Sequence, residues 1–114
     1  MAYHAGQAAE NRIAIEYERR GYSIARKRWR GPAGEIDLIT RSDTAFVFVE
    51  VKQGGSFDIA AERLGRRQMQ RICASAEHFM ATQPNAQFVD VRFDVALVDE
   101  AGEFRIIENA FGLN

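Results

Sequence analysis

The segment Gly34–Gln53, GEIDLITRSDTAFVFVEVKQ, contains the residues best suited to do chemistry. Within it, Asp37, Glu50 and Lys52 follow the spacing D-x₁₂-E-x-K, in otherwise apolar surroundings. Charged side chains are costly inside apolar strands unless they are paired or bind a metal. Carboxylates from two neighbouring strands suit a hard divalent cation such as Mg²⁺, which shares its coordination shell with phosphate groups. A lysine beside them could orient an attacking water or stabilise charge that develops on a phosphate.

Two interpretations of this pattern stay open. In the first, Asp37 and Glu50 hold Mg²⁺ or Mn²⁺, the backbone carbonyl of Val51 adds a ligand, and the site hydrolyses phosphodiesters. In the second, Glu50 or Asp37 simply forms an ion pair with Lys52 at the end of a strand, and no chemistry occurs.

Period-two alternation indicates that two strands, joined by a polar turn at Arg41–Thr44, position these residues. Successive side chains of a strand point to opposite faces of the sheet. The first strand is therefore expected to place Glu35, Asp37 and Ile39 on one face, and Ile36, Leu38 and Thr40 on the other. The second strand is expected to place Phe46, Phe48, Glu50 and Lys52 on one face, and Val47, Val49 and Val51 on the other.

A helix is predicted over about Ala2–Arg20, with a buried stripe of Ala9, Ile13, Ala14 and Tyr17. Glu10 belongs to the same stripe, which is an unusual place for a carboxylate. It could add a metal or water ligand to the site. Alternatively, its stem packs at the edge of the stripe while its carboxylate reaches water.

The strand predicted over Tyr22–Arg30 ends in a strongly basic cluster, whose members are Arg26, Lys27, Arg28, Trp29 and Arg30. These cations could lie along phosphates, with the indole ring stacked on a base or packed below the strand. The alternative is a solvated edge strand that uses its charges to discourage aggregation.

A mainly helical region is predicted over Asp58–Ala81, with an interruption near Gly65. Its buried stripe consists of Met69, Ile72, Cys73, Ala76, Phe79 and Met80. Gln68 lies beside this stripe and could face the carboxylates as a hydrogen-bonding residue. Cationic side chains crowd the first half of the region, where the helix dipole adds positive potential, and the candidate phosphate contacts are Arg66, Arg67 and Arg71.

After a loop at Thr82–Gln87, strands are predicted over Val89–Val98 and Phe104–Ile107, and Phe111 is expected to pack on the core. The order of elements predicts an α/β fold in one domain, 1–114, with a mixed central sheet flanked by helices.

Composition limits the class of protein. The formal net charge of -1 means that any nucleic acid must be held by local basic patches. A single cysteine excludes an internal disulfide and suits a reducing compartment. The first residues contain no apolar leader, and the longest apolar run, Ala45–Val49, is too short to span a bilayer. We therefore expect a cytoplasmic protein without a membrane partner.

Taken together, GEIDLI at 34–39 and FVEVK at 48–52 resemble the PD-(D/E)xK, or restriction-endonuclease-like, nuclease superfamily. The sequence resembles most closely the YraN family of bacterial proteins, which is similar to Holliday-junction resolvases. The resemblance extends from the Gly6–Ala14 helix through RFDV at 92–95 to Asn109-Ala110-Phe111.

This resemblance implies a restriction-endonuclease-like fold and a metal-dependent endonuclease that acts on DNA, branched DNA included. Asp37 and Glu50 would bind the metal, Lys52 would be the catalytic lysine, and Glu10 the acid contributed by a helix. A homodimer is an arrangement that the resemblance allows. Gln53-Gly54 stands where the family has a basic pair, and Gln68 where it often has a lysine. The alternative is a nuclease fold that binds nucleic acid or a protein without cleaving it.

Overall fold

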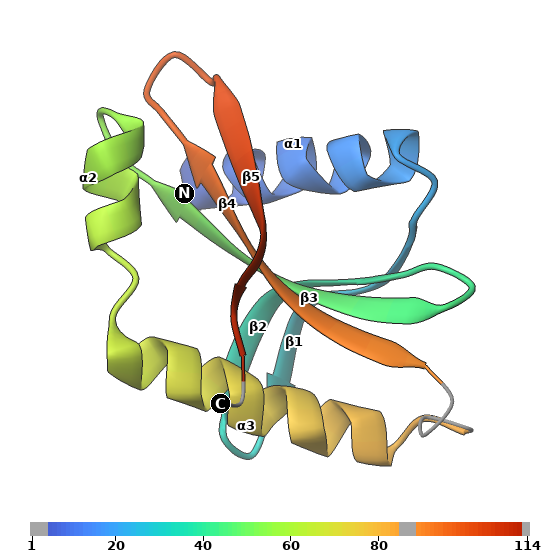
Figure 1. The fold of residues 1–114 in the computed structure, drawn as a ribbon. Coiled ribbons are helices and arrows are strands. Elements are labelled where there is room, and N and C mark those ends of the chain that lie inside the picture. The colour runs from blue at the N-terminus through green and yellow to red at the C-terminus, as the bar shows by residue number, and fades with distance from the viewer. Residues whose placement is uncertain (1–4, 85–88, 113–114) are drawn as a thin grey trace.

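The computed structural model describes residues 5–84 and 89–112. They form a five-stranded sheet in the order β1-β2-β3-β4-β5, with helices on both faces (Figure 1). The sheet is mixed, because β3 and β4 pair in parallel whereas its other neighbouring strands are antiparallel. The elements are α1 (Ala5–Arg19), β1 (Ser23–Gly31), β2 (Gly34–Arg41), β3 (Ala45–Gln53), α2 (Phe57–Glu62), α3 (Arg66–Ala81), β4 (Asp90–Val98) and β5 (Phe104–Phe111).

This architecture confirms the predicted α/β class and is consistent with a restriction-endonuclease-like fold. A parallel pair needs a crossover, which α2 and α3 provide between β3 and β4. The helical region is interrupted between Glu62 and Arg66, as predicted near Gly65. β5 continues past the predicted end at Ile107, and Phe111 stacks on Phe93 with ring centroids 5.2 Å apart.

Two cores lie on the two faces of the sheet. Val47 and Val49 pack against α1, whereas Phe46 and Phe48 pack against α3. Figure 1 shows these two helices on opposite sides of the sheet. The predicted faces of β3 and the predicted buried stripe of α1 are therefore confirmed, because side chains in a strand alternate and a helix buries one stripe. Residues 2–4 and 85–87, which fall in the predicted first helix and in the Thr82–Gln87 loop, lie outside the described residues.

The alternation predicted for β2 is wrong at Ile36. This side chain packs in the core under α3, whereas Leu38 packs in the core under α1. The reason is that β2 pairs with β3 only from Leu38 to Arg41. On the N-terminal side of Leu38, β2 separates from β3. There the carboxylate of Asp37 accepts a hydrogen bond from the N–H of Val51 at 2.8 Å.

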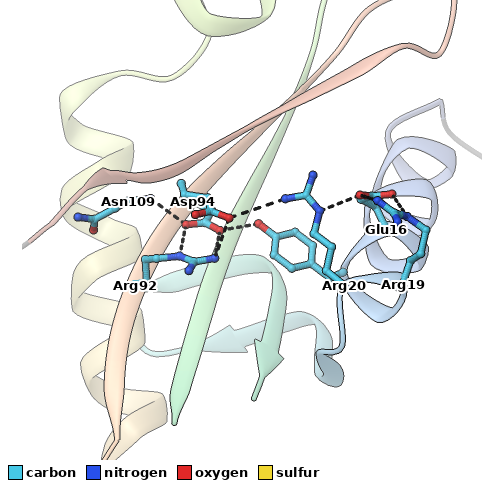
Figure 2. A network of polar contacts seen from close by, with 8 residues as sticks. Glu16, Arg19, Arg20, Arg92, Asp94 and Asn109 are labelled. Carbon is cyan, nitrogen blue, oxygen red and sulfur yellow. Dashed lines mark hydrogen bonds and ion pairs between the residues drawn. The ribbon is translucent and has the colours of Figure 1, made fainter. Parts of the chain in front are cut away.

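Asp94 on β4 is fully buried and is held by partners from three elements (Figure 2). The Tyr17 hydroxyl donates to it at 2.6 Å, the Arg92 guanidinium donates to both its oxygens at 2.8 and 2.9 Å, and the Asn109 N–H donates at 2.9 Å. Burial, followed by the bond to Asp94, raises the pKa of Tyr17, so its phenol remains a donor. The network thus ties α1 and β5 to β4.

Ion pairs extend this network towards the solvent. Glu108 lies 3.7 Å from Arg92 and 3.8 Å from Arg20, and Arg20 also contacts Glu16 at 2.7 Å (Figure 2). Arg19 and Arg20 lower the pKa of Glu16 to about 2 through their hydrogen bonds. Within the described ranges, every fully buried side-chain nitrogen and oxygen has a hydrogen-bond partner. No helix of those ranges is long and apolar enough to cross a membrane.

We expect Asp94→Ala to lower the free energy of unfolding by about 3–5 kcal/mol, because it removes the buried carboxylate that pairs with Arg92 and leaves the buried Tyr17 hydroxyl without its acceptor. Urea denaturation of the variant and the wild type measures the difference. Asp43→Ala is the matched control, since Asp43 is exposed in the turn between β2 and β3 and should change stability by less than about 0.5 kcal/mol. Equal losses in the two variants would contradict a structural role for the network.

Candidate active site

The candidate site lies where β2 and β3 separate. Asp37 from β2, Glu50 from β3 and Gln68 from α3 converge there, as predicted. They line a cavity of about 220 Å³, and its lining is completed by Gly34, Glu35, Arg71 and Ile72. Because Val51 donates its N–H to Asp37, the strand pair opens at this point and admits the side chains of α3.

Glu50 is buried, Asp37 is half-buried, and both carboxylates line the same cavity. Burial and then the negative charge of Asp37 raise the pKa of Glu50 to about 8, although Lys52 opposes the shift. Burial also raises the pKa of Asp37, against the lowering effect of the Val51 N–H. The charge of Asp37 disfavours ionisation of Glu50, so Glu50 keeps its proton to a higher pH than an ordinary glutamate does.

Lys52 and Gln68 both act on Glu50. The Lys52 ammonium nitrogen lies 3.2 Å from Glu50 Oε2, and the Lys52 side chain is 17% exposed. Gln68 Nε2 donates a hydrogen bond to the same oxygen. Lys52 emerges on the face predicted for it, and the ion pair of the simpler interpretation is present. The carbonyl of Val51 stays a predicted ligand, whereas the bond from its N–H to Asp37 was not foreseen from the pattern.

Glu10 is not brought to the carboxylate pair. It lies on α1, where its Oε1 accepts a bond from Arg28 Nε at 2.8 Å. In the part of the chain that the structure describes, no group of three or more His, Cys, Asp or Glu side chains is arranged to hold a metal ion, so Glu10 does not complete a set with Asp37 and Glu50. Burial raises the pKa of Glu10, the Arg28 bond lowers it, and the charge of Asp37 raises it again, so the carboxylates interact at longer range.

The basic cluster of β1 does not form one row. Lys27 reaches towards Asn11 of α1, with 3.5 Å between Nζ and Oδ1. Arg26 lies over the ring of Phe79 of α3, 6.0 Å from its centroid. The charged side chains of the edge strand therefore lie on both faces of the sheet. Only some of the predicted phosphate contacts can bind the same nucleic-acid strand.

Trp29 packs below its strand rather than facing solvent. Its ring meets Phe79 edge to face, with centroids 5.4 Å apart, and belongs to the core under α3. Of the two alternatives for this residue, packing is the one the structure shows. Arg30 is exposed and lies 3.6 Å from Glu35, which shares the cavity lining with Asp37.

Among the arginines of α3, Arg71 is the one that lines the cavity. Arg66 borders a separate hollow of about 650 Å³ beside Phe111, and Arg67 is exposed.

Sequence reasoning did not assign Glu35 or Gly34 to the site. Glu35 stands two residues before Asp37 in the same strand, and this spacing could have indicated that both side chains lie on one face. Gly34 is needed at its position because a φ of 143° is strained for any other residue.

The residues present fit a divalent cation. Burial and the charge of Asp37 raise the pKa of Glu50, so the two carboxylates are an oxygen donor set short of positive charge, which a hard cation supplies. Lys52 can balance one negative charge of the two carboxylates, and the proton that Glu50 retains removes the other. A cation would replace that proton, so its binding should strengthen as the pH rises.

The raised pKa of Glu50 predicts how stability depends on pH. Glu50 binds its proton more tightly in the folded protein, with a pKa of about 8, than an ordinary glutamate does at 4.5. Its contribution to stability is therefore complete below pH 4.5 and is lost as the pH rises to about 8. We expect Glu50→Gln to flatten this loss in urea denaturation across that range. The slope of the free energy of unfolding against pH is compared with those of wild type and of Glu62→Gln, a control at an exposed site. A slope for Glu50→Gln equal to both would contradict the raised pKa assigned to Glu50.

Comparison with known proteins places the chain in a family. The model of the uncharacterised protein family UPF0102 matches residues 9–98. A UPF0102 protein of Ruegeria pomeroyi is 58% identical over 108 residues, which cover 95% of this chain and 88% of that protein. One of Cereibacter sphaeroides is 52% identical over 111 residues, covering 97% and 95%. One of Dinoroseobacter shibae is 41% identical over 104 residues, covering 91% and 78%. The resemblance to the YraN family is thereby confirmed, and the chain belongs to the UPF0102 family.

Proposed function

We propose that this protein is a metal-dependent endonuclease that hydrolyses phosphodiester bonds of DNA, branched or otherwise structured DNA included. One observation carries the proposal: the half-buried Asp37 and the buried Glu50 line one small cavity, with Lys52 3.2 Å from Glu50. Structural ion pairs rarely gather two acids and one base in a low-dielectric site, because the second acid is left uncompensated. Perturbed carboxylates in a cavity are instead typical of functional sites.

Each residue of the site would have a separate role in hydrolysis. Asp37, Glu50 and the carbonyl of Val51 would hold Mg²⁺ or Mn²⁺. The cation would supply Lewis-acid polarisation of the phosphodiester and neutralise charge that develops on it. Lys52 would orient the attacking water and stabilise the phosphate oxygens in the transition state. Gln68 keeps Glu50 in position through its hydrogen bond.

The size of the cavity limits how the substrate approaches. About 220 Å³ holds a phosphate group with a few waters, since each water takes about 30 Å³. The bases of a duplex must therefore stay outside while one phosphate enters. Arg71 stands at this cavity and would contact the backbone near the bond that is cut.

A second candidate function is a nuclease fold that binds DNA or a protein without cutting. The ion pair between Lys52 and Glu50 and the bond between Glu10 and Arg28 favour it, because each satisfies an acid internally. Gln53-Gly54 also supplies no positive charge after Lys52.

A cleavage assay separates these two functions. Labelled duplex, single-stranded, flap and four-way-junction DNA would be incubated with the protein in Mg²⁺ and in Mn²⁺. We expect cutting by wild type that is lost in Asp37→Asn and in Lys52→Ala, since one variant loses a metal ligand and the other loses transition-state stabilisation. Asp43→Asn is the matched control and should cut like wild type.

The variants also separate binding from chemistry. Lys52→Ala should still be stabilised by Mn²⁺ in thermal melting, whereas Asp37→Asn should not. Cleavage that survives in Lys52→Ala would refute the lysine assignment. Clean protein that binds one of these DNAs but cuts none would support the second candidate function.

Arg71 provides a test of the nucleic-acid surface. We expect Arg71→Ala to weaken DNA binding and to reduce the slope of log K against log salt by about one, because one phosphate contact is lost. Fluorescence anisotropy over a salt series, in Ca²⁺ to prevent cutting, measures the slope. Arg105→Ala removes the same charge from β5, where the guanidinium lies over Phe57, and should leave the slope unchanged. Equal slopes for the two variants would show that Arg71 does not contact a phosphate of the bound DNA.

A further inference from the structure

Arg28 has an unusual backbone conformation in the middle of a strand. Its φ is 50°, and among the described residues Asn109 is the other non-glycine residue with a positive φ. An L-residue in this region costs about 1–2 kcal/mol, and Arg is not among the residues that adopt it readily. Strain of this kind persists where the surrounding structure imposes it, and it gathers at functional sites.

The position of this strain coincides with the opening of the sheet. On β1, Lys27 pairs with Leu38 and Trp29 pairs with Ile36, so Arg28 stands opposite Asp37. Asp37 is the residue at which β2 leaves β3. The strained residue of β1 and the first acid of the candidate site are therefore neighbours across the sheet.

The guanidinium of Arg28 is directed at Glu10. Nε lies 2.8 Å from Oε1, the Glu10 side chain is 16% exposed, and the Arg28 side chain is 44% exposed. The bond to Glu10 raises the pKa of Arg28 most, and the charges of Glu35 and Asp37 raise it further. One cation thus balances the acid of α1 while lying in the field of two acids at the cavity.

We propose that Arg28 is a positioning residue that withholds Glu10 from the metal site until a phosphodiester draws the guanidinium away. The inference rests on the proposed function, since it concerns the same metal site. It explains why Glu10 projects from the buried face of α1 yet does not join Asp37 and Glu50.

The exchange follows from the chemistry of the partners. A guanidinium binds a phosphate through paired hydrogen bonds, and Arg28 is exposed enough for DNA to reach it. Once Arg28 turns to a phosphate, Glu10 is a poorly solvated carboxylate near two further acids. A cation shared by the acids then becomes favourable, so nucleic acid and metal strengthen each other's binding.

The alternative is an ordinary salt bridge that fastens β1 to α1. Such a bridge would affect stability but would leave metal affinity unchanged. Metal binding, measured apart from cleavage, therefore distinguishes the two roles.

The experiment measures Mn²⁺ dissociation constants by electron paramagnetic resonance, without DNA. Arg28→Asn removes the guanidinium and introduces a side chain that tolerates a positive φ. We expect it to tighten Mn²⁺ binding about three- to fivefold, the range set by the strength of one partly exposed ion pair. Adding Glu10→Gln to Arg28→Asn should abolish this gain. Arg12→Asn, which removes the same charge from α1, is the control and should match wild type.

A second measurement adds a short duplex in the Lys52→Ala background, where DNA is bound without being cut. With DNA bound, Lys52→Ala and the double variant Lys52→Ala with Arg28→Asn should bind Mn²⁺ equally tightly. The reason is that DNA has already drawn the guanidinium from Glu10. Either an Mn²⁺ affinity of Arg28→Asn equal to that of Arg12→Asn, or a gain that persists with Glu10→Gln, would overturn the inference. Mn²⁺ binding that is absent, or that survives Asp37→Asn unchanged, would instead overturn the proposed function itself.

Discussion

The site depends on one hydrogen bond between a backbone and a side chain. By accepting the N–H of Val51, the Asp37 carboxylate takes the place of a rung in the ladder between β2 and β3. The two strands then part, Ile36 changes face, and α3 can bring Gln68 to Glu50. A continuous ladder would have closed the space in which the two acids meet. The opening also explains how Asp37 and Glu50 are accommodated in two strands that are largely apolar.

Two buried acids in this small protein have different surroundings. Asp94 receives donors from Tyr17, Arg92 and the Asn109 backbone, so its charge is fully compensated. Glu50 faces another acid, and its pKa is raised to about 8. The fully compensated acid joins elements of the fold, whereas the proposed cation site depends on the acid whose pKa is raised by a neighbouring carboxylate. This contrast within one sheet supports separate structural and functional roles.

Much of this arrangement could be predicted from the sequence, for identifiable reasons. Strict alternation along β3 assigned both of its faces, and the D-x₁₂-E-x-K spacing identified the acid pair and Lys52. Alternation failed at Ile36 because periodicity does not show where a ladder ends. Alternation along a strand already distributes the basic cluster over both faces, and no pattern in the sequence indicates the left-handed conformation of Arg28 within it. Asp94 was not singled out, since its partners come from distant parts of the chain.

The parallel pairing of β3 with β4 has a consequence for the order in which the protein folds. β2 and β3 are joined by a short turn, so Asp37 and Glu50 come close through local contacts. β4 can join β3 only after the α2–α3 crossover is in place, and such long-range contacts form slowly. We therefore expect the two acids to meet while they are still hydrated and to lose water when α3 docks. On this route the unfavourable desolvation of the site would come late, after much of the apolar surface is buried.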